Sequence, residues 1–66
     1  MTQFQVDVID TLTRYACEAH DTAERLREAA TKTANAGEVE YLRSVAADYT
    51  RKARQYESQI RARLSK

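Results

Sequence analysis

The stretch TKTANAGEVE, residues 31–40, contains the one strong break in a chain otherwise suited to long helices. Gly37 is the only glycine, and it can adopt the left-handed backbone conformation that ends a helix. Asn35 can cap the start of the helix that follows. We therefore predict two helices joined by a short turn, with the first helix at about residues 3–35, the turn at about 35–37 and the second helix at about 38–64.

The predicted helix ends carry residue types that stabilise helix termini. A capping box, in which two residues exchange side-chain and backbone hydrogen bonds, is predicted at both starts, between Thr2 and Gln5 and between Asn35 and Glu38. Met1 and Val6 have the spacing of a hydrophobic staple. The last turn is basic, which suits the negative end of the helix dipole, and contains Arg61, Arg63 and Lys66.

Both predicted helices carry a stripe of mostly apolar residues at alternating steps of three and four, as in a coiled coil. The first stripe is Ile9, Leu12, Ala16, Ala19, Ala23, Leu26, Ala30 and Thr33. The second is Val39, Leu42, Ala46, Tyr49, Ala53, Tyr56, Ile60 and Arg63. Folding the chain at the turn pairs Ala30 with Leu42, Leu26 with Ala46, Ala23 with Tyr49, Ala19 with Ala53, Ala16 with Tyr56 and Leu12 with Ile60. Large residues then meet small ones at most levels, as close packing requires.

The charge distribution favours the same antiparallel arrangement. Residues 1–24 contain five acidic residues and one basic residue, whereas residues 51–66 contain six basic residues and one acidic residue. A hairpin lays these oppositely charged segments side by side. The sequence thus predicts an all-α fold, a single antiparallel two-helix hairpin over residues 1–66.

The hairpin leaves apolar side chains that one stripe per helix does not use. They are Phe4, Val8 and Tyr15 in the first helix and Tyr41 and Val45 in the second. A chain of 66 residues with no Trp and one Phe has little core of its own, so we expect a homodimer that forms a four-helix bundle. In an antiparallel dimer the first group meets the second group of the other copy. The alternative is that these residues dock a larger protein, with Tyr41 and Arg43 as anchors.

Catalytic and metal chemistry is poorly supported. Cys17, His20 and Glu24 share one helix face, but the second helix offers no comparable ligand, and a surface histidine beside a half-buried cysteine explains them. The lone histidine has no evident partner for a catalytic pair, and the chain has no glycine-rich phosphate loop. We predict no enzyme activity, no metal and no cofactor.

Nucleic acid is an alternative partner, because Arg51, Arg54 and Arg61 form a basic ridge on the second helix. The layout is similar to that of Rop-type RNA-binding dimers, which are short helical hairpins that form four-helix bundles; the similarity covers the layout alone. The net charge is only +1, and many bases follow an acid by four residues, which is typical of a solvated helix surface. These pairs are Asp10–Arg14, Asp21–Arg25, Glu28–Lys32, Asp48–Lys52 and Glu57–Arg61.

The remaining features concern the cellular compartment in which we expect the chain to act. It has no apolar run long enough to span a membrane, and its start, MTQFQVDVID, lacks the pattern of a secretory signal. Its single cysteine suits a reducing compartment, so we expect a cytoplasmic protein. By elimination, the sequence favours a small homodimeric regulator of bacterial or phage type, an inhibitor, anti-activator or adaptor that binds a larger host protein.

Overall fold

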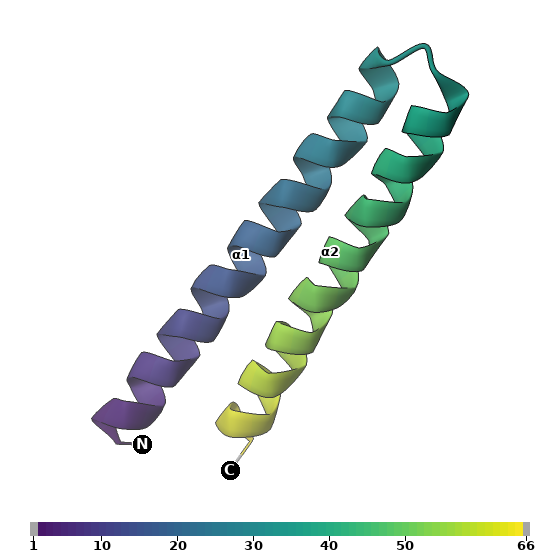
Figure 1. Cartoon of the computed structure of the whole chain (residues 1–66). Helices are drawn as coiled ribbons and strands as arrows, with labels where there is room; N and C mark the ends of the chain where they lie inside the picture. Colours follow the sequence, from purple (N-terminus) through teal and green to yellow (C-terminus); the bar gives the residue numbers. More distant parts are fainter. Residues whose placement is uncertain (1, 66) are drawn as a thin grey trace.

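The computed structural model describes residues 2–65, which form two long helices, α1 (Gln3–Lys32) and α2 (Ala36–Leu64). The helices lie side by side and run in opposite directions, with the connecting segment at one end and both termini at the other (Figure 1). The hairpin is long and thin, measuring 51 × 14 × 11 Å between its outermost Cα atoms. The predicted all-α antiparallel hairpin is confirmed.

The turn differs from the prediction in its limits and in its backbone. Helix α1 ends at Lys32 rather than at residue 35, and α2 begins at Ala36 rather than at residue 38. The residues that flank the connection, Thr33 and Asn35, are extended, and no residue from 2 to 65 has a positive φ. The left-handed conformation predicted for Gly37 is therefore wrong, because two extended residues already turn the chain.

Side-chain hydrogen bonds explain why the break lies earlier than the glycine. The Thr33 hydroxyl accepts a bond from the Asn35 backbone N–H at 3.3 Å and donates to Glu38 Oε2 at 2.8 Å. Asn35 Oδ1 accepts the Glu38 backbone N–H at 3.0 Å, so Asn35 is the predicted N-cap. The Glu38 carboxylate accepts its hydrogen bond from Thr33 rather than from the Asn35 backbone N–H, so the predicted capping box does not form. Gly37 lies inside the first turn of α2, where a Cβ atom would come within 3.2 Å of Asn35 Oδ1 and crowd the cap.

The outer ends of the helices follow the prediction. Thr2 Oγ1 accepts the Gln5 backbone N–H at 3.2 Å, and Gln5 Oε1 accepts the Thr2 backbone N–H at 3.0 Å, which confirms this capping box. Arg61 and Arg63 lie in the last turn of α2. Met1 and Lys66, and with them the predicted hydrophobic staple, lie outside the described residues.

The Asn35 cap gives a testable consequence for stability. Asn35→Ala removes the acceptor for the Glu38 N–H and is expected to lower the free energy of unfolding by about 1 kcal/mol. Urea unfolding followed by far-ultraviolet circular dichroism measures this loss. Asn35→Asp keeps an acceptor oxygen and should stay close to the native value; an equal loss in both variants would show that the cap bond contributes nothing.

The helices pack through the predicted stripes, which we call the seam. Every buried residue belongs to it, and the set is Leu12, Ala16, Ala19, Ala23, Ala30, Ala46 and Ala53. The other seam positions are half-buried, with one exception. Arg63 is exposed, contrary to its place in the stripe, because it lies in the last turn of α2, where its charge can reach water.

The seam is close-packed but contains little apolar area. Its buried members are one leucine and six alanines, and no large side chain within residues 2–65 is fully buried. Alanine lets two helices approach closely, yet it removes less area from water than Leu, Ile or Phe would. The hydrophobic stabilisation of the isolated hairpin is therefore small for a chain of this length.

Neither α1 nor α2, as far as the structure describes them, combines the length and apolarity that a membrane crossing needs.

Candidate functional site

The seam separates two long flanks with different chemistry. On one side of the seam lie the residues that come directly after seam residues such as Ala19 and Tyr56. These side chains are polar, and we call this side of the hairpin the polar flank. Its main members are His20, Arg27, Thr50 and Glu57. On the other side lie the residues that come directly before seam residues such as Ala16 and Ala46, and we call this side the apolar flank. Helical spacing places on it Phe4, Val8, Tyr15, Thr22, Ala29, Tyr41, Val45 and Lys52.

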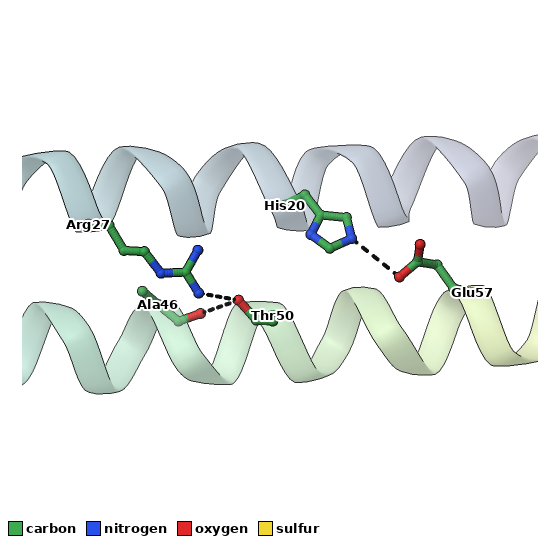
Figure 2. A network of polar contacts seen from close by, with 5 residues as sticks. All are labelled: His20, Arg27, Ala46, Thr50 and Glu57. Carbon is green, nitrogen blue, oxygen red and sulfur yellow. Dashed lines mark hydrogen bonds and ion pairs between the residues drawn. The ribbon is translucent and has the colours of Figure 1, made fainter.

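Two polar contacts join α1 to α2 along the polar flank (Figure 2). His20 Nε2 lies 3.2 Å from Glu57 Oε1, and Arg27 Nη2 donates to Thr50 Oγ1 at 2.7 Å. The Thr50 hydroxyl in turn donates to the carbonyl of Ala46 at 3.1 Å. Sequence analysis did not anticipate this contact of His20 with the facing helix. Both contacts join residues one position past the seam.

The ion pairs within each helix follow the predicted pattern in part. Asp21 and Arg25 pair at 3.1 Å as expected. Asp48 instead pairs with Arg51, and Glu57 turns to His20 rather than to Arg61. The competing partners explain both differences. Lys52 Nζ lies 5.8 Å from the centre of the Tyr49 ring, a cation–π distance, and His20 reaches Glu57 from the facing helix.

A shallow groove of about 200 Å³ lies at mid-length on the apolar flank. The ring of Tyr15 packs against the ring of Tyr56 across the helices, with centroids 5.7 Å apart and planes tilted by 48°. Ala19, Thr22 and Tyr49 line the groove with these rings, and Glu18 and Lys52 bring charges to its edges. The groove thus has a mixed lining, in which aromatic rings and an alanine lie beside polar and charged groups.

The predicted interaction residues form two clusters at opposite ends of the apolar flank. Phe4 is 73% exposed and lies one turn before Val8, near the end that holds the termini. Tyr41 is 68% exposed and lies one turn before Val45, near the connecting segment. Tyr15 is 47% exposed and lies between the clusters. The exposed aromatic rings therefore run along one side of the hairpin.

Arg43 does not belong to this surface. It is exposed, but residues two apart on a helix do not face each other, so α2 directs Arg43 and Tyr41 to different sides. Sequence analysis also gave no surface role to Val6 and Leu64, which are 37% and 56% exposed near the open end. Val6 lies at seven-residue steps from Thr13 and His20, and that spacing could have placed it on the polar flank.

The polar flank has a hollow of its own, of about 290 Å³, bordered by Cys17, His20, Glu57 and Ile60 among others. Cys17 is exposed rather than half-buried. Within residues 2–65 no three His, Cys, Asp or Glu side chains lie where they could hold one metal ion, so the spacing of Cys17, His20 and Glu24 does not become a site.

The basic ridge on α2 is only partly free. Arg51, Arg54 and Arg61 are all exposed, but Arg51 pairs with Asp48, which offsets part of its charge.

No protein-family model matches this chain, and comparisons with curated proteins and with solved structures also return no match.

Proposed function

We propose that this chain is a small protein–protein interaction module that works as a homodimeric regulator in the cytoplasm, as an inhibitor, anti-activator or adaptor. The observation that carries this proposal is the row of exposed rings on the apolar flank, Phe4, Tyr15 and Tyr41. Exposed aromatic residues on one side of a small protein are typical of binding anchors. A larger protein that docks against Phe4 and Tyr41, the two most exposed rings, has its own surface blocked or redirected.

The proposed homodimer is supported by the small core. The buried seam of six alanines and one leucine contributes little hydrophobic free energy, whereas burying a fully exposed ring contributes about 1.5–3 kcal/mol, and a half-buried valine of the apolar flank contributes part of that. A second hairpin that covers the middle of this flank provides part of that burial and completes a four-helix bundle. Small domains often reach stability by such association.

Tyr41→Ala tests the binding of a larger protein. Because Tyr41 is 68% exposed and makes no part of the seam, the variant should keep its helical circular dichroism. Its affinity for the partner, identified by pull-down from the native host and then measured with purified proteins, should fall by more than about tenfold. Phe4→Ala should act in the same direction. Glu40→Ala, an exposed neighbour, is the control, and unchanged binding in both aromatic variants would end this assignment.

Nucleic acid is the second candidate partner, favoured by the exposure of Arg54 and Arg61 at seven-residue spacing on α2. A gel-shift titration with RNA and DNA should then show binding that weakens steeply with salt. Arg54→Ala and Arg61→Ala should each reduce that slope. Absence of any shift at low salt rules this candidate out.

A further inference from the structure

We propose that the apolar flank is occupied by the same flank of a second copy, with the two hairpins antiparallel and Tyr15 of each copy seated in the groove beside Thr22 of the other. This inference rests on the proposed function, which makes this flank an interaction surface, and it names the occupant and its alignment. Three features of the flank carry it.

The first feature is the order of side-chain sizes along α1. Residues at seven-residue steps on this flank are Val8, Tyr15, Thr22 and Ala29, so the two larger side chains precede the two smaller ones. When two α1 helices pack antiparallel about a point between residues 18 and 19, Tyr15 meets Thr22 and Val8 meets Ala29. A parallel alignment sets Tyr15 on Tyr15 and Ala29 on Ala29, which crowds one level and leaves a gap at another.

The second feature is the groove, which lies at the level where this alignment places a tyrosine. Its volume is about 200 Å³, and it opens to solvent, so a side chain of a second copy can enter it from outside. Ala19 and Thr22 leave the space that the ring of the second copy enters, between the rings of Tyr49 and Tyr56. Lys52 can donate a hydrogen bond to the phenol oxygen, since buried tyrosines need a partner, and its charge can offset the two Glu18 carboxylates that this alignment brings together.

The third feature is the area of the flank. The Cα atoms of the hairpin span 51 by 14 Å, a rectangle of about 700 Å² before side chains are counted, so this face is large enough to supply the roughly 800 Å² of accessible surface that each partner buries in a stable interface. In this alignment α1 packs on α1 of the other copy, so Val8 lies against Ala29, whereas Phe4 and Tyr41 lie toward the outer edges of the flank.

Cysteine cross-linking tests the alignment. The chain carries Cys17→Ser together with Val8→Cys and Ala29→Cys, and it is treated with a short bismaleimide. Within one copy the two cysteines are about 30 Å apart along α1, so only a second copy can bring them together. We expect covalent dimer from this variant, and almost none from Val8→Cys or Ala29→Cys alone in the same background.

Each other outcome overturns the inference in a recognisable way. Cross-linking of Val8→Cys alone indicates a dimer with both open ends together. Cross-linking of the native chain through Cys17 indicates packing through the polar flank, where Cys17 lies. A monomer at all concentrations in sedimentation removes the second copy, and the proposed function then stands or falls separately on the Tyr41→Ala binding measurement.

A second test fills the groove without removing any apolar residue, and so asks whether the groove itself is needed for dimerisation. Thr22→Tyr fills the groove from within its own chain and should raise the dimer dissociation constant by more than tenfold, whereas Thr13→Tyr adds the same ring to the polar flank and should not. Unchanged dimerisation in Thr22→Tyr, with circular dichroism showing a folded hairpin, rejects the seating of Tyr15 beside Thr22.

Discussion

Ala53→Asp is expected to unfold the hairpin. Ala53 is completely buried in the seam, and no buried polar or charged side chain lies within residues 2–65 to receive a carboxylate. An unpaired charge at such a position costs several kcal/mol, and the aspartate side chain is too short to reach water from the seam. A domain of this size has a total free energy of unfolding of about 3–10 kcal/mol, so the loss is comparable to the whole.

Far-ultraviolet circular dichroism of the purified variant measures the outcome, which should be loss of most of the helical signal at room temperature. Ala47→Asp is the matched control, because Ala47 is an exposed alanine of the same helix. It should cost less than about 1 kcal/mol, the difference in helix propensity. A folded Ala53→Asp variant would mean that the two helices do not pack through this residue.

The seam was predictable because its cause is periodic. Helical geometry forces residues that touch the other helix to recur at steps of three and four, and all buried residues, from Leu12 to Ala53, follow that rule. The turn was less predictable, because its limits depend on competition between local hydrogen bonds. Sequence reasoning assigned the break to Gly37, whereas the Thr33 hydroxyl bonds to both Asn35 and Glu38 and ends α1 sooner.

The polar flank shows a second limit of sequence reasoning. Pairs four residues apart, such as Asp21 and Arg25, can be read from spacing alone because the helix brings them together. The contact between His20 and Glu57 depends on how the two helices align, and it displaces the local pair that spacing favours for Glu57. Partners on another element can therefore be predicted only after the register is known.

The candidate site was predicted in composition but not in full extent. Phe4, Tyr15 and Tyr41 stood out because they are large and lie off the seam, and the structure places them on one flank. Leu64 was overlooked because it lies off the stripe, at seven-residue steps from Thr50 and Glu57, which places it on the polar flank. The groove beside Tyr15 also escaped prediction, since its shape depends on how the rings of both helices tilt.

Leu12→Ala is the second substitution for which we expect a large effect. Leu12 is the largest buried side chain, 9% exposed, and the pairing of the stripes sets it against Ile60 near the open end. Truncating a buried leucine to alanine lowers the free energy of unfolding by about 2–5 kcal/mol. We expect a loss of about 2–3 kcal/mol here, because a thin hairpin lets neighbouring side chains and water fill part of the space.

Urea unfolding measures this loss as a lower midpoint with an unchanged slope. Leu64→Ala removes the same atoms from a residue that is 56% exposed, and it should cost less than about 1 kcal/mol. The comparison isolates burial, since both leucines lie in helices and the truncation is identical. Equal losses in the two variants would indicate that Leu64 is buried in solution as deeply as Leu12, and burial of Leu64 by a second copy would implicate the polar flank rather than the apolar flank.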